Sequence, residues 1–203
     1  MIDTREKILQ TAEALFGEQG FAATSLRQII AKAKVNLAAI HYHFGSKESL
    51  LDELVRRRAE PVNQERITRL ERLEARFNGH VPEIEQILDA FFAPTAPVAE
   101  ANPLFVRVMG RIHSEGLMPS IVQKHFHPTA KRFLAVLRRA VPHLSESEFH
   151  WRVHFMMGAM AHTMCGTPMF PIGSEDYRGR MRKLVTFLAA GFRAPASPNG
   201  DKT

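Results

Sequence analysis

The sequence has one cysteine and no long apolar run in its 203 residues. Because Cys165 has no second cysteine to pair with, an intramolecular disulfide is excluded, and a reducing compartment is the natural setting. No apolar stretch approaches the roughly 20 residues that a membrane-spanning helix needs. The start, MIDTREKILQ, is charged and then amphipathic, unlike a signal peptide. We therefore expect a cytoplasmic protein with no membrane partner.

Motifs of catalysis are also missing. The chain has no P-loop, no nucleophile elbow, no Cys–His arrangement and no carboxylate pair among apolar residues. His150 and His154 have the i, i+4 spacing of a metal pair, but no HExxH-like motif and no cysteine cluster accompanies them. Structural or exposed histidines are the favoured interpretation, and a metal pair is the alternative. We expect no enzyme, no cofactor and no metal site.

The charge balance is basic but does not identify a partner. The net charge of +6 suits a polyanion, yet residues 1–50 hold six Lys and Arg against five Asp and Glu. The surplus lies later, for example in Arg56–Arg58 and at Arg138 and Arg139, where solvated helix faces are the simpler interpretation. Charge alone is therefore a weak argument for DNA binding.

Apolar residues recur with helical spacing along the chain, and no segment shows the alternation of a strand. The pattern predicts an all-α fold of about nine helices, and Pro61 is expected to kink or split the fourth. The expected helices span approximately residues 3–17, 25–33, 36–44, 47–77, 82–92, 103–115, 119–141, 145–165 and 175–192.

The first three helices carry capping signals. Asp3 and Glu6 have the spacing of a capping box, as do Ser25 and Gln28, and Asn36 is a good N-cap for the third helix. Two short helices joined by a turn of about three residues, beside a longer first helix, are typical of a helix-turn-helix. An ordinary three-helix core without a DNA role fits the spacing equally well.

Residues 24–54, TSLRQIIAKAKVNLAAIHYHFGSKESLLDEL, make the pattern specific. Tyr42-His43-Phe44 followed by Gly-Ser-Lys-Glu and then leucines resembles the N-terminal domain of the TetR family of transcriptional regulators. Residues 35–40 with the Tyr-His-Phe that follows are similar to a subgroup that includes fatty-acid-responsive repressors. The resemblance implies a three-helix DNA-binding domain over residues 1–46, and a larger helical effector-binding and dimerisation domain over 47–193. The polar residues 194–203 are expected to form a disordered tail.

The resemblance also implies which residues contact DNA. Leu37, Ala38, Ala39 and His41 would face the major groove, the first three as an apolar surface suited to thymine methyl groups. The other implied contacts are to phosphates and involve Thr24, Ser25, Tyr42, His43 and Lys47. For His41 and His43, plain solvent exposure is the alternative.

Lys34 departs from the family, which usually has glycine at this position in the turn. If the residue has a positive φ, lysine costs on the order of 1 kcal/mol relative to glycine. Its ammonium could also provide one more phosphate contact.

In the body, the resemblance places a homodimer interface on the last two long helices, with burial inside one chain as the alternative for each residue. The candidates are Trp151, Phe155, Ala159, Leu184, Phe187, Leu188 and Gly191. Soft and aromatic side chains could line an adaptable apolar effector pocket or form plain core. The pocket candidates are Phe91, Phe92, Phe105, Met109, His113, Phe126, Phe133, Met156 and Met160.

Together these features predict a TetR-type regulator, a repressor that binds a palindromic double-stranded operator as a homodimer. A small apolar or amphipathic effector would release it. Two other classes remain as alternatives: an enzyme built on a helical bundle, and an interaction protein whose helix-turn-helix has lost DNA binding.

Overall fold

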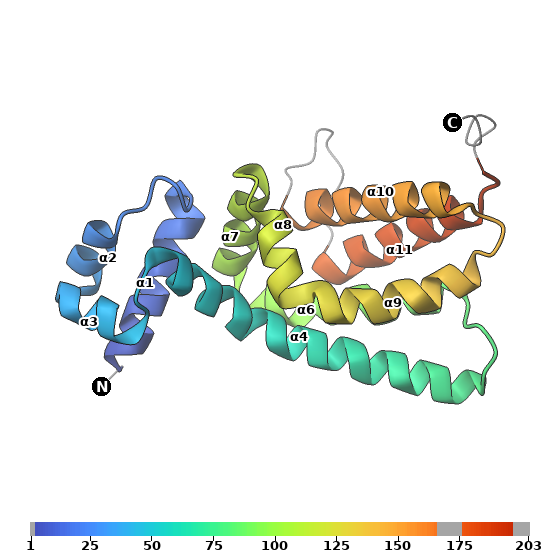
Figure 1. The fold of residues 1–203 in the computed structure, drawn as a ribbon, viewed down its shortest axis with the longest axis horizontal. Helices are drawn as coiled ribbons and strands as arrows, with labels where there is room; N and C mark the ends of the chain where they lie inside the picture. The colour runs from blue at the N-terminus through green and yellow to red at the C-terminus, as the bar shows by residue number, and fades with distance from the viewer. Residues whose placement is uncertain (1–2, 166–175, 197–203) are drawn as a thin grey trace. The chain divides into compact units, whose positions relative to one another are not determined.

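The computed structural model describes residues 3–165 and 176–196, and these residues form α-helices, one π-helical turn and connecting loops, with no strand among them (Figure 1). This confirms the all-α prediction, and within the described residues eight of the nine expected helices each correspond to one helix. The structure adds α6 (Thr95–Ala101) and divides the segment expected at 119–141 into α8 (Met118–Ile121), a π-helical turn (Val122–Phe126) and α9 (His127–Ala140). Pro128 has no N–H to donate to the preceding turn, which favours a break in the regular hydrogen-bond ladder there.

The described residues group into two compact units. Unit 1 comprises Met1–Pro61 and Ala99–Phe126, and unit 2 comprises Val62–Val98 and His127–Thr203. The two expected domains, residues 1–46 for DNA binding and residues 47–193 for effector binding and dimerisation, are defined by function, and this division stays a prediction. Residues 197–203 of the expected tail lie outside the described residues.

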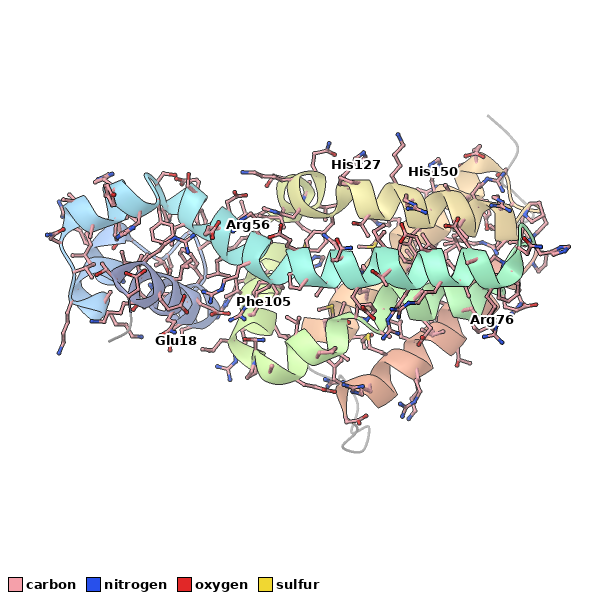
Figure 2. All side chains as sticks on the ribbon, turned by 90° about the horizontal axis from the view of Figure 1, so that it is seen from below. Glu18, Arg56, Arg76, Phe105, His127 and His150 are labelled. Atoms are coloured by element: carbon pink, nitrogen blue, oxygen red, sulfur yellow. The ribbon has the colours of Figure 1, made fainter. Side chains whose placement is uncertain are left out.

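The helix α4 (Lys47–Phe77) contributes to both units, since Pro61 lies at the end of the first stretch of unit 1. The helix is continuous through Pro61, so of the two expected effects of this proline, a kink or a split, the split does not occur. It carries Arg56 in its first part and Arg76 near its end (Figure 2).

Unit 1 is built around α1 (Thr4–Gln19), on which α2 (Leu26–Ala33) and α3 (Leu37–His43) pack. Phe16 of α1, Ile29 of α2 and Ile40 of α3 are all 0% exposed, so one apolar side chain from each helix closes the core. Burial of such side chains contributes about 1.5–3 kcal/mol each. The three short helices therefore derive their stability from one shared core.

Local capping fixes where α2 and α3 begin. The backbone N–H of Gln28 donates to Ser25 Oγ at 3.3 Å, and Ser25 N–H donates to Gln28 Oε1 at 2.7 Å, so this capping box is confirmed. Asn36 Oδ1 accepts from Ala39 N–H at 2.8 Å, which confirms the N-cap of α3. Each of the two helices therefore begins where a capping residue and its partner three positions later form hydrogen bonds.

The capping box expected at the start of α1 is wrong. Asp3 occupies the N-cap position, but its side chain makes no capping hydrogen bond. Glu6, its expected partner, instead accepts from Arg57 of α4 and from Gln10. A guanidinium 51 positions away in the sequence thus competes successfully for the carboxylate.

A second segment of unit 1, α7 (Pro103–Ser114), packs along α1. The close approach occurs at Gly17, where an added Cβ would lie 3.3 Å from the carbonyl oxygen of Leu104. Arg111 Nη2 donates to the carbonyl oxygen of Glu18 at 3.0 Å. The end of α1 is therefore held by α7 as well as by α2 and α3.

In unit 2, α5 (Ile84–Phe92) packs against α9 and α11 (Tyr177–Arg193). The ring of Phe91 contacts that of Phe133 with centroids 5.1 Å apart. Arg66 is buried beside them: its Nε donates to the carbonyl oxygen of Phe91 at 2.8 Å, and its guanidinium lies 4.0 Å from the Phe91 ring centroid. Burial lowers the pKa of Arg66 to about 10, so the group is still charged at neutral pH.

The helices α10 (Glu146–Cys165) and α11 lie side by side (Figure 1). Arg152 of α10 joins them, because its guanidinium donates to the carbonyl oxygens of Gly191 at 2.6 Å, Ala194 at 2.7 Å and Pro195 at 2.8 Å. Glu148 one turn earlier accepts from Arg152 at 2.8 Å. The carbonyl groups that end α11 are thereby satisfied by a side chain of its neighbour.

Candidate nucleic-acid interface

The outer face of α3 exposes apolar and aromatic side chains. Leu37 is 51% exposed and Tyr42 is 86% exposed, and Ala38 is exposed beside them. Ile40 on the opposite face is fully buried, and Asn36 caps the first turn. The helix is thus fixed in place while it presents Leu37 and Ala38, both expected at the major groove, to solvent; Ala39 is half-buried.

His41 has a defined hydrogen-bonding state. Its Nδ1 lies 3.0 Å from the carbonyl oxygen of Gly45, which can only accept, so Nδ1 carries the proton. In the neutral ring Nε2 is then an acceptor. The side chain is exposed, so this acceptor is available to a partner outside the unit.

The two aromatic residues that follow differ in accessibility. Tyr42 is almost fully exposed, whereas His43 is half-buried, with its ring 5.1 Å from Tyr42 and 6.1 Å from Phe44. Of the two expected phosphate contacts, the Tyr42 hydroxyl is the more accessible donor.

Thr24 and Lys47, both expected at phosphates, are engaged inside unit 1. Thr24 is 1% exposed and its hydroxyl donates to the carbonyl oxygen of Gly20 at 2.6 Å, so its single O–H donor is already used. Lys47 Nζ donates to the carbonyl oxygens of Phe21 at 2.9 Å and Thr24 at 2.8 Å. A phosphate contact by Lys47 would rely on its third N–H. Sequence reasoning did not foresee these contacts because the partners are backbone groups of a loop, and the phosphate role of both residues stays a prediction.

Ser25 and Lys34 stand at the two ends of α2. The hydroxyl of Ser25 is exposed but used in the capping box. Lys34 is exposed and adopts the left-handed conformation at φ 53° and ψ 49°, and its N–H donates to the carbonyl oxygen of Ile30. The positive φ that glycine would accommodate freely is therefore present in this turn.

Arg27 is a candidate that the sequence analysis did not include. It is exposed in the first turn of α2, directly after the exposed Ser25 and the helix's first residue. A cation there is disfavoured by the helix dipole, which attracts anions to a helix N-terminus. That unfavourable placement is the feature of the sequence by which Arg27 becomes a candidate contact for an external anion.

The expected dimer residues divide into exposed and buried ones. Trp151 is 55% exposed, Phe155 62% and Phe187 71%, and the rings of Trp151 and Phe155 stack at 5.8 Å. Gly191 is exposed and Ala159 is half-buried. By contrast, Leu184 and Leu188 are buried within the chain itself, as the alternative interpretation allowed. The exposed aromatic side chains of α10 and α11 form what we call the aromatic face, namely Trp151, Phe155 and Phe187.

The nine expected pocket residues fall into both units. Phe91, Phe92, Phe133, Met156 and Met160 belong to unit 2, and Phe105, Met109, His113 and Phe126 belong to unit 1. The phenylalanines other than Phe126 are buried, as is Met156, whereas His113 is exposed. Burial agrees with both core and pocket lining, so the effector pocket stays a prediction.

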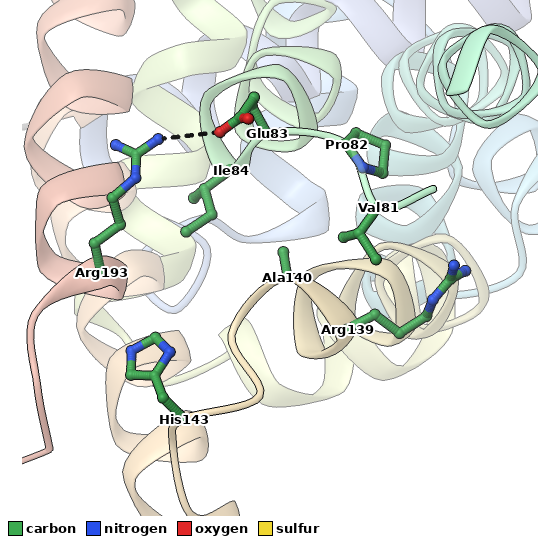
Figure 3. Close-up of a pocket in the computed structure, with 8 residues that line it drawn as sticks. All are labelled: Val81, Pro82, Glu83, Ile84, Arg139, Ala140, His143 and Arg193. Carbon is green, nitrogen blue, oxygen red and sulfur yellow. Dashed lines mark ion pairs between the residues drawn. The ribbon is translucent and has the colours of Figure 1, made fainter. Parts of the chain in front are cut away.

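A pocket of about 500 Å³ lies elsewhere in unit 2 (Figure 3). None of the nine expected residues lines it; its lining is Val81, Pro82, Glu83, Ile84, Arg139, Ala140, His143 and Arg193. Arg193 forms an ion pair with Glu83 at 3.6 Å and a closer one with Glu85. This mixed-charge lining differs from the apolar one expected for the effector.

The described residues gather no group of three or more His, Cys, Asp or Glu side chains that could hold a metal ion. His150 and His154 instead contact aromatic rings, at 5.8 Å from Phe149 and 5.7 Å from Trp151. Within the same part of the chain, no helix combines the length and apolar character needed to cross a membrane.

Two capped short helices, joined by the three residues 34–36 and packed on a longer helix, define a helix-turn-helix protein. Residues 8–54 match the family described as "Bacterial regulatory proteins, tetR family", and residues 87–191 match "Tetracyclin repressor-like, C-terminal domain". The chain belongs to the TetR family of transcriptional regulators and is a DNA-binding regulator, not an enzyme.

Individual relatives agree with this placement. The chain is 30% identical over 155 residues to the HTH-type transcriptional repressor Rv3405c of Mycobacterium tuberculosis, which covers 72% of this chain and 70% of that protein. It is 43% identical over 63 residues to the HTH-type transcriptional regulator LmrA of Bacillus subtilis, a match that spans 30% of this chain and 34% of LmrA. The match to YttP of the same species spans only 26% of that protein.

Solved structures show the same fold. A TetR-family regulator from Shewanella sp. PV-4 is 21% identical with a TM-score of 0.65, over 94% of this chain and 96% of that one. The TetR-family regulator PfmR from Thermus thermophilus is 22% identical with a TM-score of 0.62, over 92% and 99%. At these identities the likeness concerns the fold alone.

Proposed function

We propose that this regulator is a repressor that binds a palindromic operator as a homodimer and is released by a small, largely apolar effector. The observation that carries the DNA-binding part is the outer face of α3, where Leu37 and Tyr42 are exposed on a helix whose cap and buried Ile40 fix its position. An exposed leucine next to an exposed tyrosine, on a helix fixed in position, indicates a surface that a binding partner covers. Binding to DNA would place the protein in the cytoplasm.

The state of each side chain suggests its role. Leu37 and Ala38 suit thymine methyl groups. Since Nδ1 of His41 donates to Gly45, its Nε2 acceptor suits the amino group of adenine or cytosine in the major groove. Tyr42 and Arg27, both exposed, suit phosphate oxygens.

Selection from a random double-stranded DNA pool at about 0.15 M salt tests this function. Enrichment of an inverted repeat, bound with an affinity that falls steeply with salt, is the expected result. With folded protein and no enrichment, the interaction-protein alternative would replace this proposal.

Variants assign the roles on the selected operator. His41→Ala should change the preferred base at one or two positions in each half-site, at a cost of about 1–3 kcal/mol for the preferred base. Tyr42→Phe should weaken binding to all DNA sequences to a similar extent, and it therefore serves as the matched control. An unchanged base preference in His41→Ala would remove His41 from the groove.

The aromatic face supports the homodimer. Trp151, Phe155 and Phe187 are each more than half exposed, and an added Cβ at Gly158 or Gly191 would meet nothing within 4 Å. Close helix approach is therefore possible at both glycines. Phe155→Glu should convert a dimer into a monomer in analytical ultracentrifugation, because it places a charge in an apolar interface. Val81→Glu, at another exposed apolar residue in unit 2, is the control.

The effector is proposed to be apolar or amphipathic because the pocket candidates are mostly phenylalanine and methionine. The similarity of residues 35–40 to the fatty-acid-responsive subgroup concerns the recognition helix and therefore the operator more than the ligand. With the operator known, compounds can be screened for loss of DNA binding. Release by charged, hydrophilic compounds only would contradict the proposed lining.

A further inference from the structure

The α1–α2 loop, residues 20–25, is contacted from two directions within unit 1. It connects α1 to the helix-turn-helix, and its last residue, Ser25, caps α2. Any change in its position is therefore transmitted to the start of α2.

Glu115, the residue directly after α7, contacts the loop from one side. Its two carboxylate oxygens accept from the backbone N–H groups of Phe21 and Ala22, each at 2.9 Å. A carboxylate accepting from two amides makes charge-assisted hydrogen bonds, which are stronger than neutral ones. The fit is close: Gly20 has φ +92°, and a Cβ there would lie 2.1 Å from Glu115 Oε1.

Lys47, the first residue of α4, contacts the loop through its carbonyl groups. Its ammonium donates to Phe21 and Thr24 and lies 4.2 Å from the Phe21 ring centroid. The loop is thus held through its N–H groups by a carboxylate and through its carbonyl groups by an ammonium. Glu115 lies within the part of the chain that matches the C-terminal family, whereas the loop lies within the N-terminal match.

We propose that Glu115 is a positioning residue for operator recognition: its contacts with Phe21 and Ala22 fix the helix-turn-helix on α7, so that the two heads of a dimer fit one half-site spacing. Arg111, which donates to Glu18 at the end of α1, supports the same attachment. This inference rests on the proposed function. It differs from a role in stability alone, because it concerns which operators are accepted rather than whether the chain folds.

The experiment compares the full-length protein with Glu115→Ala and Glu115→Gln. Amide hydrogen exchange at Phe21 and Ala22 should accelerate at least about tenfold in Glu115→Ala, since the loss of two charge-assisted acceptors frees both groups. Glu115→Gln keeps one acceptor oxygen and should give an intermediate value. Glu60→Ala is the matched control, because Glu60 pairs with Arg56 on the exposed surface of α4 in the same unit.

DNA binding supplies the deciding measurement. On the selected operator and on versions with one base pair added or removed between half-sites, Glu115→Ala should reduce spacing discrimination about threefold or more. Its affinity for an isolated half-site should stay within about twofold of the original. Faster exchange with unchanged spacing discrimination would overturn the positioning role and leave Glu115 structural. Unchanged exchange would overturn the contact itself, and no enriched operator with the unaltered protein would overturn the proposed function.

Discussion

Replacing Lys34 with glycine should stabilise the protein. Lys34 adopts φ 53° and ψ 49°, where the Cβ of an L-residue costs about 1–2 kcal/mol. Glycine removes that cost but loses about 0.5–1 kcal/mol through the larger conformational entropy of the unfolded chain. With both contributions at the middle of their ranges, the net expected gain in the free energy of unfolding is about 0.75 kcal/mol. For a chain of this length the gain corresponds to roughly 1–4 °C in Tm.

Urea unfolding followed by circular dichroism, with all variants at one protein concentration, measures this gain. Lys34→Ala is the matched control, because it removes the ammonium but keeps the Cβ, and its free energy of unfolding should change by less than about 0.5 kcal/mol. If Lys34→Gly is no more stable than Lys34→Ala, the left-handed conformation is not a source of strain and the reasoning fails. Both variants lose the ammonium, so an equal loss of operator affinity in the two would assign a phosphate contact to Lys34.

Two further predictions concern unit 1. The pKa of Glu53 is lowered from 4.5 to about 2, first by the hydrogen bond from Arg56 and further by Arg5, against an opposing effect of burial. A carboxyl group whose pKa is lower in the folded than in the unfolded state stabilises the fold at pH values above its unfolded-state pKa. Glu53→Gln should therefore cost on the order of 1–2 kcal/mol at pH 7. In urea unfolding this difference should vanish as the pH falls from about 4.5 to about 2. A pH-independent difference would contradict the ion pairs. Gly20→Ala should destabilise by about 2–3 kcal/mol, because φ +92° and the Glu115 carboxylate both oppose a side chain; calorimetry showing no loss would contradict this geometry.

Sequence reasoning succeeded where the determining interactions are local. Ser25 with Gln28, and Asn36 with Ala39, are separated by three residues, and the structure shows both caps as expected. The same reasoning failed at Glu6, whose carboxylate is taken by an arginine from another helix. Capping patterns are informative only when no distant charge competes for the same side chain.

The candidate site shows the same distinction between local and distant partners. Motif similarity directed attention to α3, whose outer residues are exposed. It could not reveal that Thr24 and Lys47 bind carbonyl groups inside the unit, since a threonine or lysine near a helix start is equally suited to a phosphate. No pattern in the sequence pointed to Glu115, because its contacts are to backbone amides 93 and 94 positions away.

The guanidinium of Arg152 has a thermodynamic consequence for any partner of the aromatic face. By binding the carbonyl groups at the end of α11, it fixes that helix to α10, and both helices carry the exposed rings. The entropy lost in aligning the two helices is therefore lost when a single chain folds. A second copy that docks on this face meets an already ordered surface, so association costs mainly rigid-body freedom and the ordering of a few side chains.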